Sequence, residues 1–417
     1  MKSFTKFSLW AMLLSFPFTA LQSQTTESWT AQKATVERLS KNQTEFNYYE
    51  EKVPAYTLPD VLTTANGKKI TSAKQWEKLR RPELLELFTT QVYGRVPNTP
   101  YKTEFKLIKE DPNAMNCAAT LKLVDINISA NNKTLTIHLG LFTPNKAKQP
   151  VPAFLLICNR PPAENIDFTR EKKSEFWPAE EVIARGYAVA AFYNGDVDPD
   201  KHDNFQDGIH ALLDADRNNE SWGTLAAWAL GASRCLDYLA TDKAIAADKV
   251  AVIGHSRGGK TALWAGAVDQ RFAMICCNEA GCGGTSLARR KYGETIDRIN
   301  KAFPHWFCPN YKAYSNRENE MPVDMHQLMA LIAPRALYVA AASEDLWADP
   351  KGQYLALYHS LPIYRLYNKK TILPEAMPPM NVPARNNQVA YHVRDGVHNL
   401  TLKDWNFYMD QADRVLK

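Results

Sequence analysis

The sequence lacks features that would divide it into separate units or attach it to nucleic acid. Its 417 residues contain no internal repeat, low-complexity tract or linker, so we expect one main domain with decorating insertions. The 50 lysines and arginines are scattered, and the formal net charge is only +5. Nucleic-acid binding needs a basic face or stripe, and none is present. No phosphate-binding or dinucleotide-binding glycine motif stands at the end of a predicted strand.

Cysteine is scarce and irregularly spaced. The 7 cysteines include no Cys-x-x-Cys pair and no histidine spacing that would make a zinc site. Several stand inside apolar runs, where small thiols are commonly buried. An odd number leaves at least one thiol unpaired. We expect structural cysteines with at most one disulfide, and no metal.

The apolar run near the start of the chain is too short for a confident membrane span. Residues 9–21 follow Lys2 and Lys6 and give way to a polar stretch, which is the pattern of a secretory signal peptide. We predict a signal peptide at residues 1–23 and a secreted or periplasmic protein. No cysteine follows the run, which argues against a lipoprotein anchor. A retained membrane anchor is the alternative.

Two kinds of strand pattern follow residues 24–100, for which we predict an N-terminal wrapping segment with helices. Residues 117–143 alternate as half-buried antiparallel strands do. Continuous apolar runs then recur at residues 153–158, 187–193, 250–253, 272–277, 336–342 and 388–394. Such runs are typical of parallel strands buried on both faces. We predict an α/β fold in which residues 101–417 form the catalytic domain, a three-layer sandwich with a mostly parallel central sheet and antiparallel N-terminal strands.

The stretch that organises the site is Gly254-His-Ser-Arg-Gly258, between the apolar run at residues 250–253 and a helical pattern from Thr261. A Gly-x-Ser-x-Gly motif in this context is typical of the nucleophile elbow of α/β-hydrolases, where small residues leave room for a strained turn. The turn directs the backbone N–H of Arg257 toward an oxyanion formed over Ser256. We predict that Ser256 is the nucleophile of a serine esterase. A glycine-rich strand-to-helix loop is the alternative.

A serine nucleophile needs a base, and the base needs an acid that orients it. In this fold the order along the chain is serine, acid, histidine. His398 fits best as the base because it follows the last predicted strand, in a loop ahead of a terminal helical pattern. His392 lies within that strand and more plausibly serves packing or a hydrogen bond. The other histidines that follow the serine are His305, His326 and His359.

Two carboxylates end two different predicted strands. Glu279 follows the run at residues 272–277, and Asp345 follows the run at residues 336–342. The second position is the usual place of the acid in this fold. Either carboxylate could reach the imidazole of His398, so the residues alone leave the choice open.

At these residues the chain resembles the glucuronoyl esterases, carbohydrate esterase family 15. The resemblance rests on Gly254-His-Ser-Arg-Gly-Gly-Lys260 with Asn278-Glu-Ala-Gly281, and it extends to Arg81-Pro-Glu-Leu, Leu346-Trp347 and Gly396-Val-His398. Fungal members have a cysteine just before the nucleophile, tied by a disulfide to the histidine loop. Here His255 and residues 397–399 contain no cysteine, so the chain looks like a member of the bacterial branch.

The resemblance implies the remaining roles. Glu279 would be the principal acid, with Asp345 as helper or substitute. Arg257 would stabilise the oxyanion through its backbone N–H and its guanidinium. The side chains implied for substrate binding are Lys260, Trp347 and Trp306.

The resemblance also implies the reaction, which needs no cofactor. The substrate would be an ester between a 4-O-methyl-glucuronoyl side chain of xylan and a lignin alcohol, hydrolysed through an acyl-enzyme. An acetylxylan esterase or other carbohydrate esterase on the same scaffold is the nearest alternative. A non-catalytic polysaccharide-binding protein is the alternative from another class. We expect a monomer with no nucleic-acid partner and no stable membrane association.

One acidic pattern lies outside this set. Asp196, Asp198 and Asp200, with Asp207 at the twelfth place, imitate a calcium-binding loop. Lys201 occupies the sixth place, where the sharp turn needs glycine. We predict a solvated acidic loop, with a metal site as the alternative.

Overall fold

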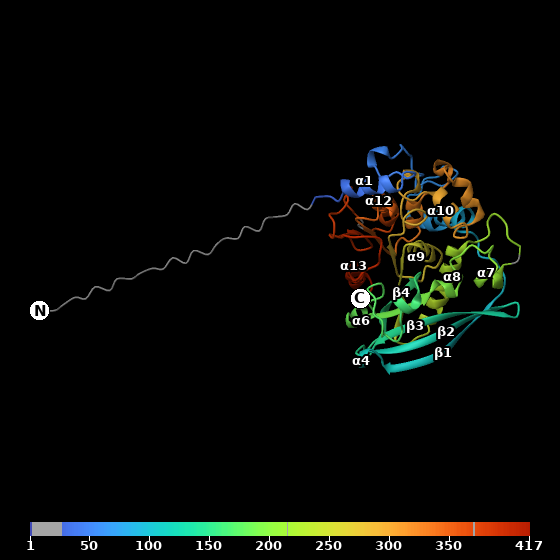
Figure 1. Cartoon of the computed structure of the whole chain (residues 1–417), viewed down its shortest axis with the longest axis vertical. Coiled ribbons are helices and arrows are strands. Elements are labelled where there is room, and N and C mark those ends of the chain that lie inside the picture. The colour runs from blue at the N-terminus through green and yellow to red at the C-terminus, as the bar shows by residue number, and fades with distance from the viewer. Residues whose placement is uncertain (2–26, 215, 370–371) are drawn as a thin grey trace.

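The computed structural model describes residues 1, 27–214, 216–369 and 372–417. The predicted signal peptide therefore lies, apart from Met1, outside the described residues. Within them one 10-stranded sheet has the order β1-β2-β3-β5-β4-β6-β7-β8-β10-β9 (Figure 1). Its strands are β1 (Lys102–Asn113), β2 (Ala119–Ala130), β3 (Lys133–Pro144), β4 (Val151–Cys158), β5 (Ala188–Tyr193), β6 (Ile245–His255), β7 (Met274–Asn278), β8 (Ala336–Ala342), β9 (Ala384–Arg385) and β10 (Val389–Arg394).

The centre of the sheet is parallel and its flanks are antiparallel. Strands β5, β4, β6, β7, β8 and β10 pair in parallel. Strands β1, β2 and β3 pair antiparallel with one another, β3 pairs antiparallel with β5, and β9 with β10. All six continuous apolar runs of the sequence coincide with the parallel strands. The mostly parallel sheet with antiparallel N-terminal strands is thus confirmed.

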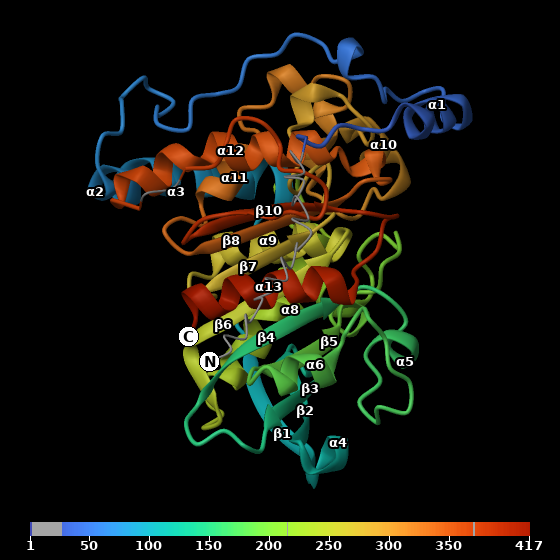
Figure 2. The same cartoon turned by 90° about the vertical axis from the view of Figure 1, so that its left-hand side faces the viewer.

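Side chains on the parallel strands alternate between two cores, as the pleat requires. On β4, Leu155 and Ile157 enter one core, whereas Phe154 and Leu156 enter the other. The first core is covered by α3 (Arg81–Phe88), α8 (Thr224–Leu239), α9 (Arg257–Val268), α11 (Met325–Ala330) and α12 (Pro350–Leu366). The second is covered by α6 (Ala179–Ala184) and α13 (Leu402–Val415) (Figure 2). This is the three-layer α/β-hydrolase arrangement that the sequence predicts.

The other helices are short and lie in the connections. The α-helices among them are α1 (Lys33–Asn42), α2 (Ala73–Gln75), α4 (Ala114–Cys117), α5 (Pro162–Asn165), α7 (Gly208–Leu213) and α10 (Ile296–Ala302). Short stretches of 3-10 or π-helix are η1 (Glu50–Lys52), η2 (Trp76–Arg80), η3 (Thr89–Tyr93), η4 (Asn194–Asp196), η5 (Ala288–Arg290), η6 (Pro309–Tyr314), η7 (Glu318–Glu320) and η8 (Leu346–Ala348). Among the described residues, no helix has the length and apolar composition needed to cross a bilayer.

The N-terminal segment lies across the end of the molecule that carries α12, opposite the β1–β2 hairpin (Figures 1 and 2). The hydroxyl of Ser28 donates to the carbonyl oxygen of Met377 at 2.8 Å, and the N–H of Trp29 donates to Pro378 at 3.2 Å. Further along, Asn47 accepts a backbone hydrogen bond from Gly293 at 2.9 Å. The segment is therefore attached to loops that lie far away in the sequence.

The cysteines correct one expectation. All seven are free, so none forms the single disulfide that the sequence allowed. Cys276 and Cys277 are adjacent on β7 and enter opposite cores, because neighbouring strand residues point to opposite faces. Cys117 is exposed and the other thiols are buried among apolar side chains.

Candidate active site

Ser256 occupies a tight turn between β6 and α9. Its backbone has φ 57° and ψ −123°, a conformation that is costly for a residue with a side chain. The turn needs glycine at position 254, since a β-carbon there would lie 2.0 Å from the carbonyl oxygen of Gly258. Helix α9 begins at Arg257, so its first N–H groups and its dipole face the serine. The strand, turn and helix expected around the motif are all present.

The imidazole of His398 lies between two carboxylates. Its Nδ1 is 2.7 Å from an oxygen of Asp345 and 3.0 Å from an oxygen of Glu279. Glu279 follows β7, Asp345 follows β8, and both are buried. The ring of His398 lies 4.4 Å from that of His255, centroid to centroid, and His255 directly precedes Ser256. The structure thus brings the serine turn, the histidine and both acids together.

The protonation states of Glu279 and His398 depend on each other. Burial raises the pKa of Glu279, and the Asp345 carboxylate raises it further, although the hydrogen bond with His398 acts in the opposite direction. Burial lowers the pKa of His398, but hydrogen bonds to Asp345 and Glu279 and their charges outweigh burial, so the pKa is raised. Because the charge on Glu279 affects that on His398 and the reverse, these two groups titrate as a coupled pair.

The other candidate histidines lie elsewhere. His392 is buried in β10, where its Nε2 lies 2.8 Å from Asp404, as expected of a histidine that serves a hydrogen bond. His326 donates to a backbone carbonyl at 2.8 Å, and His359 on α12 is its neighbour. Among the described histidines that follow the serine, His398 alone meets both acids.

The side chain of Arg257 is held by a carboxylate. Asp200 accepts one hydrogen bond from Arg257, and its other oxygen accepts from His305 at 2.9 Å and from the indole of Trp306 at 2.8 Å. The guanidinium also lies 4.8 Å from the centroid of the Trp306 ring. Burial opposes the charge of Asp200, but these hydrogen bonds and the Arg257 charge lower its pKa to about 2. The cation beside the nucleophile is therefore neutralised within the protein.

The remaining carboxylates of the acidic pattern have separate partners. Asp196 accepts from a backbone N–H at 3.1 Å, and Asp198 accepts from a threonine hydroxyl at 2.7 Å. Asp207 pairs with Lys201 at 2.7 Å. A calcium site needs several oxygens directed at one point. Carboxylates with individual partners do not supply that arrangement.

One group of described side chains has the spacing of metal ligands. His255, Glu279 and His398 each place one possible ligand atom within 4.8 Å of the others. These atoms already have protein partners, since Nδ1 of His255 lies 2.6 Å from the side-chain oxygen of Asn278 and Glu279 accepts from Arg394 at 2.7 Å. The chemistry of the group is therefore that of a hydrogen-bonded relay, and we assign no metal to it.

Lys260, a predicted substrate-binding residue, is 4% exposed. Its ammonium donates to the carbonyl oxygens of Ala280 and Cys282 at 2.6 and 2.7 Å and lies 3.2 Å from the carboxylate of Glu294. An ammonium has three N–H donors, so a sugar hydroxyl would have to displace one of these partners. The contact of Lys260 with a sugar stays a prediction, whereas its support of the glycine-rich loop after Glu279 is observed.

The two predicted tryptophans differ in accessibility. Trp306 is 2% exposed and lies parallel to Phe303, with 3.8 Å between ring centroids. Trp347 is half-buried and packs edge-to-face on Phe46, with centroids 4.7 Å apart. Trp306 supports Arg257 from within the protein, whereas Trp347 is partly accessible and its contact with a ligand stays a prediction. Phe46 attaches the N-terminal segment to Trp347, two residues after Asp345.

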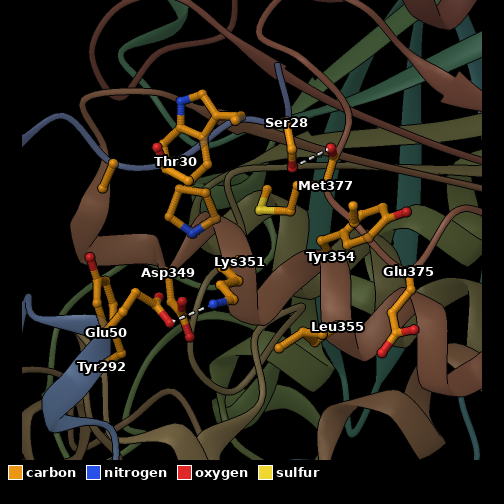
Figure 3. A pocket seen from close by; sticks show the side chains of 14 residues that line it. Ser28, Thr30, Glu50, Tyr292, Asp349, Lys351, Tyr354, Leu355, Glu375 and Met377 are labelled. Atoms are coloured by element: carbon orange, nitrogen blue, oxygen red, sulfur yellow. Dashed lines mark hydrogen bonds and ion pairs between the residues drawn. The ribbon is translucent and has the colours of Figure 1, made fainter. Parts of the chain in front are cut away.

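A cavity of about 260 Å³ lies beside the first turn of α12 (Figure 3). None of the predicted site residues lines it. Three of its charged side chains are paired, Lys351 with Glu50 at 2.9 Å and Asp349 with Arg290 at 2.9 Å. Figure 3 shows Lys351 directed at Glu50. The cavity is therefore separate from the candidate active site.

Sequence reasoning missed several side chains that touch the site. Asp200 belongs to the acidic pattern that the sequence showed, but its pairing with Arg257 could not be inferred from that pattern. Glu294, Phe46 and Arg394 gave no local signal, because their contacts are with residues distant in the sequence.

Comparisons with known proteins match the sequence and the fold of this chain to one family. A family model described as glucuronyl esterase, fungi, matches residues 126–367. Carbohydrate esterase MZ0003 from an unidentified prokaryote is 40% identical over 399 residues, which cover 88% of this chain and 91% of that protein. The 4-O-methyl-glucuronoyl methylesterase of Podospora anserina is 29% identical over 310 residues, 72% of this chain but only 58% of that protein. A solved glucuronoyl esterase from Solibacter usitatus has a TM-score of 0.82 and 38% identity, covering 88% of this chain and 100% of that one.

Proposed function

This chain belongs to the glucuronoyl esterase family, carbohydrate esterase family 15, and on that premise we propose that it hydrolyses glucuronoyl esters through an acyl-enzyme on Ser256. As a member of this family it is a carboxylic ester hydrolase. The proposed substrates are esters between 4-O-methyl-glucuronoyl side chains of xylan and lignin alcohols. The relative from Podospora anserina carries the name of a 4-O-methyl-glucuronoyl methylesterase, which supports this substrate class.

The observation that carries the proposal is the position of His398. Its Nδ1–H has two carboxylate acceptors at 2.7 and 3.0 Å, which leaves Nε2 as the basic atom. The carboxylates fix the tautomer and favour the imidazolium that forms when Nε2 takes a proton. The ring of His398 lies 4.4 Å from that of His255, which directly precedes the strained turn at Ser256.

Acylation follows from these positions. Nε2 of His398 takes the proton of the Ser256 hydroxyl while the oxygen attacks the ester carbonyl carbon. The tetrahedral oxyanion is stabilised by the N–H of Arg257 at the start of α9, a donor whose loss typically costs about 3 kcal/mol of barrier. The bond to the alcohol then breaks, and His398 returns the proton to the leaving oxygen. The products of this step are the free alcohol and a glucuronoyl ester of Ser256.

Deacylation repeats the sequence with water. His398 takes a proton from the water, the hydroxide oxygen attacks the acyl carbon, and the proton returns to the Ser256 oxygen as the serine ester breaks. Glucuronic acid is released as its carboxylate. The enzyme regains its starting state, so the cycle consumes only ester and water.

The charges around the serine also favour a neutral ester. Arg257 is paired with Asp200, and Lys260 with Glu294. A site built to hold a free carboxylate in the ground state would leave a cation unpaired. Here both cations have anionic partners, which suits an uncharged ester and makes the anionic product easy to release.

The test is hydrolysis of a benzyl ester of glucuronic acid by the wild type and by Ser256→Ala. Ser129→Ala is the matched control, because Ser129 lies on β2 and its hydroxyl is paired with that of Thr134. We expect Ser256→Ala to lose at least about 10,000-fold in kcat and Ser129→Ala to stay within twofold. An acetylated xylan is assayed in parallel.

Each outcome separates the candidate functions. Activity on the acetyl ester alone would replace this proposal by the acetylxylan esterase. No activity on either, together with failure of a fluorophosphonate probe to label Ser256, would favour the binding protein. Cleavage of the glucuronate ester by Ser256→Ala at the wild-type rate would exclude the acyl-enzyme.

The remaining features of the chain complete the proposal. Residues 1–23 act as a signal peptide, residues 24–100 wrap the catalytic domain formed by residues 101–417, and the protein is a secreted or periplasmic monomer. The pattern of Lys2, Lys6 and the apolar run supports the signal peptide. N-terminal sequencing of the exported protein tests it, and a mature chain that still begins at Met1 would exclude it.

A further inference from the structure

Arg394 is a buried arginine at the end of β10, immediately before the loop that carries His398. It is 3% exposed. Its Nε donates to Asp404 at 2.9 Å and one Nη donates to the carbonyl oxygen of Asp395 at 2.9 Å. The other Nη lies 2.7 Å from Glu279, 2.9 Å from the carbonyl oxygen of Val397 and 2.6 Å from that of Asn399. Every nitrogen of the guanidinium is therefore in use.

These contacts fall on both sides of His398. The carbonyl groups of Val397 and Asn399 flank the histidine, and both accept from Arg394. The N–H of Asn399 donates to Glu279 at 2.9 Å. The loop is otherwise at the surface, since the side chain of Val397 is 62% exposed, and surface loops are mobile unless their backbone is tied. Arg394 and Glu279 together supply that tie.

The same guanidinium balances charge where two acids meet. Glu279 is fully buried, and Asp345 shares Nδ1 of His398 with it. Two carboxylates at one site repel each other, and burial makes the repulsion stronger. Arg394 contacts the Glu279 oxygen that does not face His398. The titratable and charged groups around Glu279 are His398, Asp345, Arg394, Arg160 and His255.

We propose that Arg394 is a positioning residue, the counter-charge and backbone clamp that lets Glu279 and Asp345 share one imidazole nitrogen. The role rests on the proposed esterase function and acts through His398, since no contact of Arg394 with a substrate is involved. It places a non-covalent cross-link between the end of β10, the loop at residues 395–401 and the first turn of helix α13.

The proposal assigns two effects to Arg394, a counter-charge for Glu279 and a clamp on the loop backbone, and two substitutions distinguish them. Arg394→Met removes both the charge and the N–H donors. Arg394→Lys keeps the charge near Glu279 but cannot reach the loop carbonyls and Asp404 at once, because an ammonium is a compact donor on a flexible stem. Arg185→Met is the control: Arg185 also binds carboxylates of α13, those of Asp410 and Asp413, and has no contact with the histidine loop.

The experiment is the pH dependence of kcat/KM for the benzyl glucuronate ester, with circular dichroism to verify folding. Removing a cation raises the proton affinity of the groups around it. We therefore expect Arg394→Met to move the acid limb to higher pH by about one unit and to reduce kcat by about 10- to 100-fold, with KM within about twofold. Arg394→Lys should keep the wild-type acid limb and still lose kcat, and Arg185→Met should match the wild type.

A background without the carboxylate completes the test. In Glu279→Gln the group that Arg394 balances no longer titrates, so adding Arg394→Met should shift the acid limb by less than half as much. Wild-type kinetics in Arg394→Met, or an equal shift in the Glu279→Gln background, would overturn the proposal. If Arg394→Met does not fold, Arg394→Lys with an unchanged kcat would overturn it. An inactive wild type would instead reject the esterase function.

Discussion

An oxygen of Asp345 lies 2.7 Å from Nδ1 of His398. Glu279 lies 3.0 Å from the same atom, so either carboxylate can orient the imidazole when the other is removed. We expect Asp345→Asn and Glu279→Gln each to reduce kcat by about 10- to 100-fold and the double variant by about 10,000-fold. Steady-state hydrolysis of the benzyl glucuronate ester measures this. A single substitution as damaging as the double one would show that only one acid acts.

The two carboxylates also set the working pH. His398 must be neutral to accept the serine proton, and its hydrogen bonds to both acids raise its pKa. Activity should therefore rise through an acid limb that lies above the ordinary histidine pKa of about 6.5. Asp345→Asn removes one anion, lowers the pKa of His398 and should move the limb to lower pH. A limb below 6.5 that Asp345→Asn leaves in place would contradict this account.

Asp200 should control how tightly the site holds its product. Asp200→Asn leaves the Arg257 charge without its carboxylate partner, so free glucuronate should inhibit more strongly and kcat/KM for the ester should fall by about tenfold. Asp207→Asn is the control, because Asp207 is in the same loop and pairs with the exposed Lys201 rather than with Arg257. Unchanged inhibition by glucuronate in Asp200→Asn would show that the pair does not govern product release.

Lys260 should contribute more to stability than surface lysines do. Lys260→Met leaves the carboxylate of Glu294, 9% exposed, without its cation, and breaking such a buried pair costs about 3–5 kcal/mol. Lys301→Met, whose lysine is 73% exposed in its pair with Asp297, should change stability by less than about 0.5 kcal/mol. Urea unfolding of the two variants gives the comparison. Equal free energies of unfolding would mean that Lys260 is not structural.

The seven free thiols predict a simple labelling pattern. Cys117 is exposed and the other cysteines are buried, so a thiol reagent should label one cysteine per folded chain and all seven after unfolding. Reducing agent should leave the melting temperature unchanged, since no disulfide exists to break. Labelling of Cys276 or Cys282 in the folded protein, or a melting temperature lowered by reductant, would disagree with this structure.

The sequence pattern alone predicted the parallel strands and the serine turn, because both depend on residues that are close together in the sequence. The parallel strands are apolar along their whole length because both faces are covered, and the serine turn needs Gly254 for a steric reason. Strand β1 was not predicted, because most of its side chains are exposed and it pairs only with β2. A strand that buries so little leaves no apolar period in the sequence.

The sequence predicted the site residues that directly follow strands. It did not predict contacts between side chains that are distant in the sequence. Ser256, Glu279, Asp345 and His398 each stand after a recognisable strand, so parallel topology alone places them at one edge. The partners of Arg257 and Lys260 come from segments 57 and 34 residues away. Such pairings depend on loop paths, which no periodicity encodes. The sequence allowed at most one disulfide and none is present. The number of cysteines does not reveal which faces of the strands the thiols occupy.

The attachment of the N-terminal segment has a consequence for biogenesis. The hydroxyl of Ser28 donates to the carbonyl oxygen of Met377, 349 positions away in the sequence. The ring of Phe46 packs edge-to-face on that of Trp347. Ser28 can therefore make this contact only after Met377 has been synthesised. The contact of Phe46 with Trp347 therefore forms only after the loop that carries Trp347 has been synthesised.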